Sequence, residues 1–441
     1  GSPASSTGRA SPERCVEAAR GRGSAVKPGR LPLVARYTWA LHWPAAMLEG
    51  TALGILGIST FVAKRSLGAE EAVVALLVAF WQVLWIFAPA VGHLLERAHP
   101  QRLFRRLAVV AFLPVALVGF VDVEPLPGQP GLGTGNLALF VGLLFVHHMA
   151  GVAFVPHRGA LVRSNYPLAV RGRFWGFLTM AAFAGQALAA KLGGWLLDND
   201  PRWLRVLYPC AAIAGGAGYW LLGRIRWRRQ GRPLLRAIGD GPWAAMKRAG
   251  REAVRILRTD VAFRTYEIGF MLYGFGFLAS IVLLVLYIEG PMGLSYNQYT
   301  WAQVVAFPVG QILAAPLFGR LADRIGVERA TAASFLALAV FFVCMPYVDT
   351  ALVLVVAFGL FGAAMAGVNV GWNLGPIRFA PDGKAHMYAA VHFSMVGIRS
   401  ALAPFLGFLV KEHFSFPVAF RMSAALVVVG ALTLWRLGGR R

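Results

Sequence analysis

Several ionisable side chains stand inside long apolar stretches, where each is a candidate for proton or ion chemistry. Glu49 lies about 11 residues into the first such stretch, near the middle of a membrane at about 1.5 Å per helical residue. A carboxyl at that depth carries a proton, contacts a cation or pairs with another charge. We predict Glu49 as a protonatable site. The alternative is a carboxyl that is permanently protonated or paired.

His147 and His148 lie near the middle of a later apolar stretch. Histidine titrates near neutral pH, so it can relay protons or bind a metal. Neighbouring residues of a helix point about 100° apart, so the two imidazoles are not expected to face one cavity equally. His147 is the one predicted to be a site residue.

The other buried charges need partners or a route to water. Arg399 cannot be neutralised and requires an anion, either a carboxylate such as Glu49 or a bound solute. A structural ion pair between helices is the alternative. Lys191 is a site residue or a side chain that snorkels to water. Glu267, followed by Tyr273, is a cavity residue or a first-turn acid at a helix N-terminus.

Amides provide further polar groups at helical spacing. Asn369 and Asn373 are four residues apart and share a helix face, which suits hydrogen bonds to a polar solute or to another helix. Gln303 and Gln311 are two turns apart and are predicted to line the same cavity. Gln82 and Gln186 are further candidates.

The sequence also contains candidate metal ligands. His147 and His148 precede a methionine, and His392 and Met395 are three residues apart on one face. Imidazole and thioether ligands together suit copper, but methionine is also common filler in membrane helices. Metal uptake is therefore kept as an alternative, and no resident metal or cofactor is predicted.

The elements that hold these residues follow from composition. Of 441 residues, 57% are hydrophobic and 14% are charged, and the mean hydropathy is +0.60. Soluble domains carry about 25% charged residues, so we predict a membrane protein. The net charge of +23 lies in short loops between apolar runs, which argues against nucleic-acid binding. Cys210 and Cys344 sit in apolar runs and are predicted to be small core residues.

Apolar stretches of about 20 residues are long enough to cross a bilayer as helices. The sequence predicts twelve, at about 38–62, 72–94, 104–122, 134–156, 174–197, 204–223, 265–289, 298–319, 330–347, 351–376, 385–411 and 415–436. We predict an all-α membrane protein of twelve helices, which the internal repeat described below divides into two six-helix bundles.

The two predicted bundles cover residues 37–223 and 265–436. Residues 1–36 form a basic tail without an apolar run, predicted to be disordered, and 437–441 form a short C-terminal tail. The basic linker 224–264 includes a stretch with helical spacing at 242–258. It is predicted to lie on the membrane surface, attracted to anionic lipid, or to be a solvated linker helix.

Basic residues predict the orientation, because cytoplasmic loops carry the excess of Lys and Arg. With the N-terminus inside, the inner segments hold 35 of the 43 basic residues and the outer loops hold 5. Both termini are therefore predicted to be cytoplasmic.

One short polar segment occurs twice between apolar stretches. Residues 319–329 read GRLADRIGVER, and residues 92–102 read GHLLERAHPQR. The glycines suit a tight turn between helices. The Asp323 carboxylate can accept hydrogen bonds from the start of a neighbouring helix.

This pattern resembles the G-x-L-a-D-r-x-G-r-r signature of the major facilitator superfamily. The earlier copy departs from it, with Glu96 for the aspartate and His99 for the second glycine. The resemblance implies the two-bundle fold. It also implies conformational-switch loops at Gly92, Glu96, Arg97, Gly319, Asp323 and Arg324. Antiporters of this superfamily often have R-x-x-x-G in the fourth helix. His147 stands at that arginine's position, which argues against a drug/proton antiporter.

An internal repeat agrees with that fold. Residues 149–152 (MAGV) recur at 365–368, an offset of 216, and the polar segments are 227 apart. The difference of 11 residues matches the Pro/Gly-rich loop near 124–136, which has no long counterpart in the second half. Duplicated halves of this kind normally hold a site near the midplane between them, with alternating access.

The predicted function is a proton-coupled secondary transporter of a small polar solute, anionic if Arg399 binds it. Coupling is assigned to Glu49 and to His147. The alternatives are a copper-type uptake transporter and a non-transporting assembly or lipid-handling factor. The sequence has no Walker loop, zinc-protease pattern or nucleophile elbow, so no enzyme is predicted. We expect a monomer in the inner (plasma) membrane.

Overall fold

The computed structural model describes residues 32–87, 99–128, 132–166, 168–226, 242–381 and 385–439. The tail 1–31 and the switch-loop residues Gly92, Glu96 and Arg97 lie outside these ranges. In the first half the helices are α2 (Leu33–Leu56), α3 (Ser59–Ser66), α4 (Glu71–Val83), η1 (Leu84–Phe87), α6 (Pro100–Val110), α7 (Phe112–Leu117), η2 (Val118–Phe120), α8 (Leu137–Asn165), α9 (Leu168–Asn199), η3 (Pro201–Trp203) and α10 (Leu204–Leu222).

The second half opens with the linker helix α11 (Pro242–Thr259). It continues with α12 (Val261–Glu289), α13 (Tyr296–Thr300), the π-helical turn η4 (Trp301–Ala306), α14 (Phe307–Ile325), α15 (Val327–Cys344), η5 (Met345–Tyr347), α16 (Ala351–Arg378), α17 (Ala385–His413) and α18 (Phe416–Gly439).

Among the described residues, nine helical segments are long and apolar enough to cross a membrane. The shorter apolar segment Glu71–Phe87 and the helices α9 and α10 pack among them. Together they supply the twelve segments that the sequence predicts. The helix starts follow local chemistry: Asp260 caps α12 by accepting from the Phe263 amide. Ser295 and Gln298 form a reciprocal capping box at α13.

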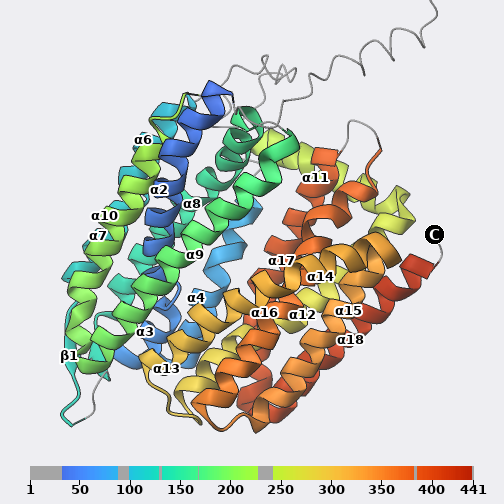
Figure 1. The fold of residues 1–441 in the computed structure, drawn as a ribbon. Helices are drawn as coiled ribbons and strands as arrows, with labels where there is room; N and C mark the ends of the chain where they lie inside the picture. Colours follow the sequence, from blue (N-terminus) through green and yellow to red (C-terminus); the bar gives the residue numbers. More distant parts are fainter. Residues whose placement is uncertain are drawn as a thin grey trace, which may run out of the picture.

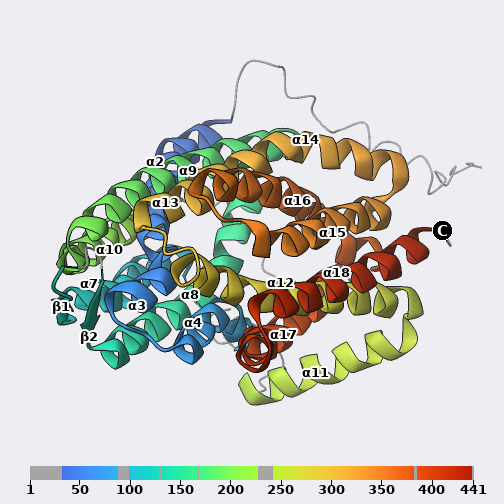
Figure 2. The same ribbon diagram turned by 90° about the horizontal axis from the view of Figure 1, so that it is seen from below.

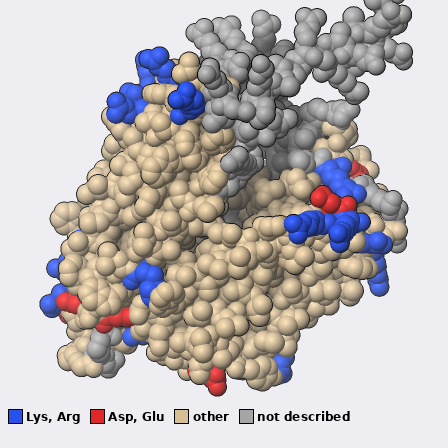
Figure 3. Space-filling view, viewed as in Figure 1, with Lys and Arg blue, Asp and Glu red and all other residues tan. Residues whose placement is uncertain are grey.

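The helices are arranged as two bundles, as predicted. The helices from α2 to α10 form one side of Figure 1 and those from α12 to α18 form the other. The bundles meet at the end that carries β1, α3 and α13, which we call the hairpin end. They stand further apart at the opposite end, near α6 and α11, which we call the linker end (Figure 1). Figure 3 shows the surface hollowed between the two halves toward the linker end, beside residues drawn in grey.

Small residues allow neighbouring helices to approach closely. A methyl group at Gly50 of α2 would lie 1.9 Å from the Ala182 carbonyl oxygen of α9, so only glycine fits there. The loop predicted near 124–136 contains a short hairpin. Its strands β1 (Val123–Pro125) and β2 (Gly133–Gly135) pair antiparallel, with Val123 opposite Gly135.

Two expectations from the sequence are wrong. Gly319 is not part of the turn after α14, because that helix continues to Ile325. The turn is made by Gly326, whose φ of 88° favours glycine. Cys210 and Cys344 are exposed rather than in the core, because an apolar run in a membrane protein covers both the core face and the lipid face.

The linker helix α11 lies along the outside of the C-terminal bundle and contacts α12 and α17 (Figure 2). Its exposed side carries Lys247, Arg251, Arg255 and Arg258. Close to its end, the Tyr388 hydroxyl donates to Asp260 Oδ2 at 3.0 Å. Burial, and then this hydrogen bond, raise the pKa of Tyr388.

Candidate functional site

A cavity of about 400 Å³ lies in the N-terminal half. We call it the N-half pocket. Its walls come from α2, η1, α7, α8 and α10, and most of the lining is apolar or aromatic. The lining residues are Glu49, Ala52, Leu53, Leu56, Trp85, Phe112, His147, His148, Gly151, Val152, Phe154, Arg158 and Tyr219.

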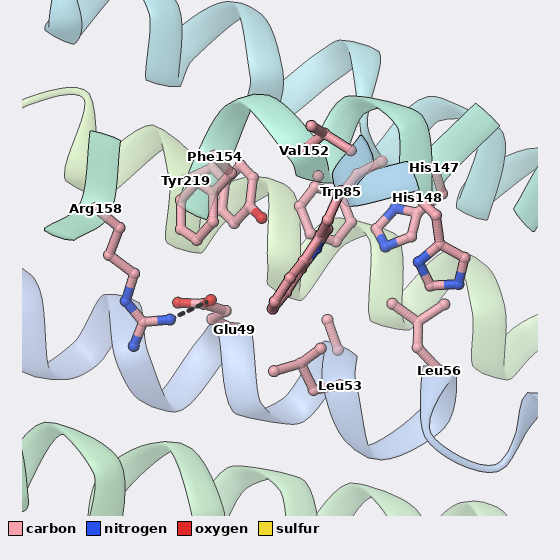
Figure 4. Close-up of a pocket in the computed structure, with 13 residues that line it drawn as sticks. Glu49, Leu53, Leu56, Trp85, His147, His148, Val152, Phe154, Arg158 and Tyr219 are labelled. Atoms are coloured by element: carbon pink, nitrogen blue, oxygen red, sulfur yellow. Dashed lines mark hydrogen bonds and ion pairs between the residues drawn. The ribbon is translucent and has the colours of Figure 1, made fainter. Parts of the chain in front are cut away.

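An ion pair forms one end of the pocket. Arg158 Nη1 of α8 donates to Glu49 Oε1 of α2 at 2.8 Å, and the dashed line in Figure 4 marks this contact. Glu49 is 7% exposed, and its side chain points into the pocket beside the rings of Tyr219 and Phe154 (Figure 4). Because a guanidinium stays charged at any accessible pH, Glu49 is the member of this pair that can change charge.

Two imidazoles lie at the other end of the pocket (Figure 4). His147 is buried and its Nδ1 is 2.7 Å from the Ala111 carbonyl oxygen, so Nδ1 carries the proton. His148 also lines the pocket, with the two ring centroids 5.2 Å apart. Both imidazoles therefore line one cavity, although neighbouring residues of a helix point in different directions. The pocket is wide enough around α8 to reach two neighbouring positions.

Trp85 connects this pocket to the other half of the molecule. Its ring lies between the ion pair and the imidazoles (Figure 4). It also contacts Phe393 of α17 edge-on, with centroids 5.6 Å apart. One wall of the N-half pocket is thus in contact with the C-terminal bundle, and a movement of α17 against α4 and η1 would change that wall.

A second cavity of about 230 Å³ lies between the bundles, and we call it the seam pocket. Gln303 and Gln311 both line it, as the sequence predicts, together with Gln186 from α9 and several aromatic rings. The π-helical turn η4 carries Gln303, whose buried Oε1 has no hydrogen-bond partner within the described structure. Among the described residues that line this pocket there are amides but no charged side chain.

The C-terminal half holds a separate group of buried charges, the C-half cluster of Glu267, His392 and Arg399. His392 Nδ1 lies 3.0 and 3.2 Å from the two Glu267 carboxylate oxygens. Arg399 Nη1 donates to the Phe270 carbonyl oxygen at 2.6 Å. All three are at most 3% exposed. Glu267 lies in the second turn of α12, so it is not a first-turn acid.

The structure does not bring Arg399 to Glu49. Besides its carbonyl partner, the guanidinium lies over the Tyr273 and Trp372 rings, 5.7 Å from each centroid. Tyr273 is buried and stacks on Phe335 at 4.1 Å. The C-half cluster is therefore packed among aromatic rings and does not line either pocket described above.

Three other predicted residues are found away from both pockets. Asn369 and Asn373 are exposed on α16, where the Asn373 amide donates to the Asn369 carbonyl at 2.8 Å. Lys191 does not snorkel to water: its ammonium donates to Asn297 of α13, at 3.2 Å from the backbone oxygen and also to the side-chain oxygen. It joins the two bundles at the hairpin end.

More contacts close the hairpin end. Asp198, at the end of α9, accepts from the Tyr296 and Asn297 amides at 2.7 and 2.8 Å, so it caps α13 of the other bundle. The Tyr296 and Ser66 hydroxyls are 2.6 Å apart, and Arg65 Nη1 donates to the Leu294 carbonyl at 3.2 Å. This end of the molecule is shut by polar contacts across the seam.

At the linker end, Asp323 and Arg324 are exposed in the last turn of α14. The metal-ligand candidates are split between the halves: His147 and His148 are in α8, and His392 and Met395 are in α17. Within the described ranges no group of three or more His, Cys, Asp or Glu side chains is placed to hold a metal ion.

Arg158 is not among the site residues that the sequence predicts. The predicted helix ends at 156, which assigns Arg158 to an inner loop, whereas α8 continues to Asn165. A signal was present: Arg158 follows His147 by 11 residues, about three helical turns, so both lie on one face. Tyr219 and Trp85 were missed as well, since aromatic residues in apolar runs are usually core.

The fold is that of a multi-pass membrane protein of two helical bundles. A family model described as Major Facilitator Superfamily matches residues 267–441. "Multidrug resistance protein MdtG" of Dickeya zeae (strain Ech586) is 22% identical over 411 residues, 90% of this chain and 93% of that protein. "Uncharacterized MFS-type transporter YuxJ" of Bacillus subtilis (strain 168) is 25% identical over 298 residues, 66% of this chain and 73% of that protein.

Solved structures share the fold. The nucleoside transporter NupG (D323A mutant) superposes with a TM-score of 0.66 at 13% identity, covering 92% of this chain and 99% of that one. A POT family transporter in complex with 5-aminolevulinic acid gives a TM-score of 0.68 at 13% identity, covering 91% and 96%. The second half of this chain thus matches the Major Facilitator Superfamily model, and the proteins and structures similar to most of the chain include MFS-type, nucleoside and POT family transporters.

Proposed function

We propose that this protein is a proton-coupled secondary transporter of a small amphipathic organic solute that carries an anionic group. The observation that carries the proposal is the Glu49–Arg158 ion pair in the wall of the N-half pocket. Most of the remaining wall is aromatic or aliphatic, which suits the apolar part of such a solute. The similarity to proteins named for multidrug resistance agrees with an organic solute.

Coupling follows from the charges of the pair. When Glu49 is ionised, it neutralises Arg158, and an anion gains little by entering. When Glu49 takes up a proton, Arg158 loses that counter-charge, and an anionic group can replace the carboxylate. Proton and anion therefore favour each other's binding, and by linkage each raises the affinity for the other by the same factor. His147 and His148 line the far end of the pocket and are proposed as solute contacts.

Alternating access uses the two ends of the molecule. The contacts of Asp198, Lys191 and Ser66 close the hairpin end, while the bundles diverge toward the linker end. Rocking of the bundles about the N-half and seam pockets would open the first end and close the second. Asp323 and Arg324, exposed here, are proposed as switch residues that make contacts when the linker end closes.

The surroundings of the protein are proposed from its charge pattern. Lys and Arg gather at the linker end in Figure 3, so we place that end and both termini in the cytoplasm, with the protein in the inner membrane as a monomer. The basic side of α11 is proposed to contact anionic lipid.

The alternatives stated above have less support. The wall of the N-half pocket contains an ion pair and two imidazoles, whereas a protein that handles lipid or assembly without transport would be expected to have a sealed cavity with no polar lining. Nothing in the arrangement of His392 and Met395 favours a metal.

The test has two steps. First, a thermal-shift screen of the purified protein against organic anions, amines, sugars and divalent metals identifies a solute, because a ligand stabilises the state that it binds. Second, flux of that solute into proteoliposomes is measured with and without a pH gradient. We expect accumulation driven by the gradient in the wild type and in Glu124→Gln, an exposed carboxyl in β1. Glu49→Gln should only equilibrate the solute. Gradient-driven accumulation by Glu49→Gln would refute the coupling role.

A further inference from the structure

The C-half cluster contains an imidazole with the geometry of an oriented base. The His392 Nδ1 contact is shared between both oxygens of Glu267, at 3.0 and 3.2 Å. This is the geometry of one N–H donating to an ionised carboxylate, since a protonated carboxyl would offer a single O–H to the ring. The neutral imidazole then carries its proton on Nδ1, and Nε2 keeps a lone pair.

That second nitrogen is not used by any side chain or backbone group that the structure describes. His392 is 1% exposed, and its Nε2 has no hydrogen-bond partner in the described part of the chain. A buried polar atom without a partner normally costs free energy, so such an atom indicates a role outside the static packing. The ring is held among aromatic neighbours, with the Trp372 and Phe270 centroids at 4.9 and 5.1 Å.

Arg399 determines the charge of the cluster. Its guanidinium is buried and positive, and Glu267 is a carboxylate that acts on it electrostatically. With His392 neutral, the two fixed charges cancel. Adding a proton to His392 leaves the cluster with one excess positive charge. The other titratable groups that face it are Tyr266 and Tyr273 of α12, with Glu328 of α15 acting on Tyr266.

The cluster is separated from the N-half pocket by a layer of aromatic rings. Trp85 lines that pocket and contacts Phe393, and Phe393 contacts Trp372 with centroids 5.9 Å apart. Trp372 in turn touches His392. The contact between Trp85 and Phe393 crosses the seam, so a rocking movement of the bundles would alter the layer that covers Nε2.

We propose that His392 is a second proton-binding residue of the transport cycle, with Glu267 as the positioning residue that fixes its ring. A proton from water adds to the Nε2 lone pair, and no bond within the protein breaks. The imidazolium stays paired with Glu267, and the proton later returns to water. This proposal rests on proton-coupled transport for its use, but the binding of the proton can be tested separately.

The test is nitrogen NMR of the full-length protein in lipid nanodiscs, with histidines labelled with ¹⁵N. The difference between the wild-type spectrum and that of His392→Gln identifies the His392 signals. We expect a neutral ring with Nδ1 protonated and Nε2 bare in the alkaline sample, and Nε2 protonated in the acidified sample. Glu267→Gln should shift the neutral ring toward the tautomer with the proton on Nε2, because the carboxylate acceptor is gone.

Two results would overturn the proposal. One is a wild-type ring that carries its proton on Nε2, and the other is a ring that stays neutral across the whole range. His413→Gln is the control, because that imidazole is exposed at the end of α17 and its loss should leave the His392 signals unchanged. None of these readings requires transport, so they stand even if Glu49 proves not to couple.

Discussion

The two bundles share a layout of helices but hold their buried charges in different ways. In the N-terminal half, Glu49 and Arg158 face a cavity of about 400 Å³. In the C-terminal half, Glu267, His392 and Arg399 are packed among aromatic rings and line neither pocket. We propose that the first arrangement lets a solute exchange partners with an ion pair, and that the second accepts a proton but no solute.

The glycine contacts show which positions correspond. A methyl group at Gly218 of α10 would lie 3.0 Å from the Ala45 carbonyl and 3.3 Å from the Glu49 amide nitrogen. At Gly430 of α18 it would lie 2.7 Å from the Gly269 carbonyl and 3.0 Å from the Tyr273 amide nitrogen. Glu49 therefore corresponds to Tyr273, over whose ring Arg399 lies. The repeat preserved the backbone packing, while the acid at this position is present in one half only.

The largest loss of stability is expected from removing one charge of the Glu49–Arg158 pair, which faces the N-half pocket. Arg158→Leu leaves the Glu49 carboxylate buried without that partner and should destabilise the protein by roughly 3–5 kcal/mol. Thermal unfolding in detergent measures this loss. Arg205→Leu is the control, because the Arg205–Asp122 pair has the same length of 2.8 Å but is exposed, and such pairs contribute about 0–1 kcal/mol.

The same unfolding experiment includes a double variant that should recover part of the lost stability. Adding Glu49→Gln to Arg158→Leu removes the uncompensated carboxylate, so the double variant should be more stable than Arg158→Leu alone. A double variant no better than the single one would mean that the two side chains are not coupled, and the contrast between the halves would lose its main support.

A smaller effect is expected in the C-half cluster. A methyl group at Gly274 of α12 would lie 2.1 Å from Arg399 Cζ, so Gly274→Ala must displace the guanidinium or shift the helices. Overpacking of this kind costs typically 1–3 kcal/mol. Gly319→Ala is the matched control, because it is also a helical glycine but has open space around it. Equal unfolding temperatures for the two variants would show that Arg399 is not tightly packed.

The smallest effect is expected at the hairpin end, on the equilibrium between its closed and open forms. Asp198→Asn removes the negative charge that caps α13 across the seam, an interaction worth about 0.3–1 kcal/mol at a helix N-terminus. The fraction of molecules in which this end is open should therefore rise by up to about fivefold. The rate of maleimide labelling of Thr300→Cys measures this fraction, because Thr300 is buried in this conformation. Asp200→Asn is the control, because Asp200 caps η3 within its own bundle. Equal labelling in both variants would remove Asp198 from the closure.

The sequence predicts the fold well, because twelve apolar stretches and a duplicated polar segment are features of the chain alone. It also identifies Glu49, Glu267 and Gln303 as buried polar residues worth attention. It does not identify their partners. Arg158 is not predicted as a partner because the predicted helix ends before it, whereas α8 continues nine residues beyond that end. Arg399 is predicted to need an anion, either a carboxylate or a bound solute, whereas a backbone carbonyl and aromatic faces can also surround a guanidinium.

In the proposed cycle, Glu49 in the N-half pocket is the carboxyl that gains a proton when the solute binds, and Glu267 of the C-half cluster is not. Infrared difference spectroscopy measures this directly, because a protonated carboxyl has its own C=O stretching band. On addition of the solute with the largest thermal shift, we predict that this band appears in the wild type and in Glu267→Gln, and is absent in Glu49→Gln. A band that persists in Glu49→Gln would contradict the account.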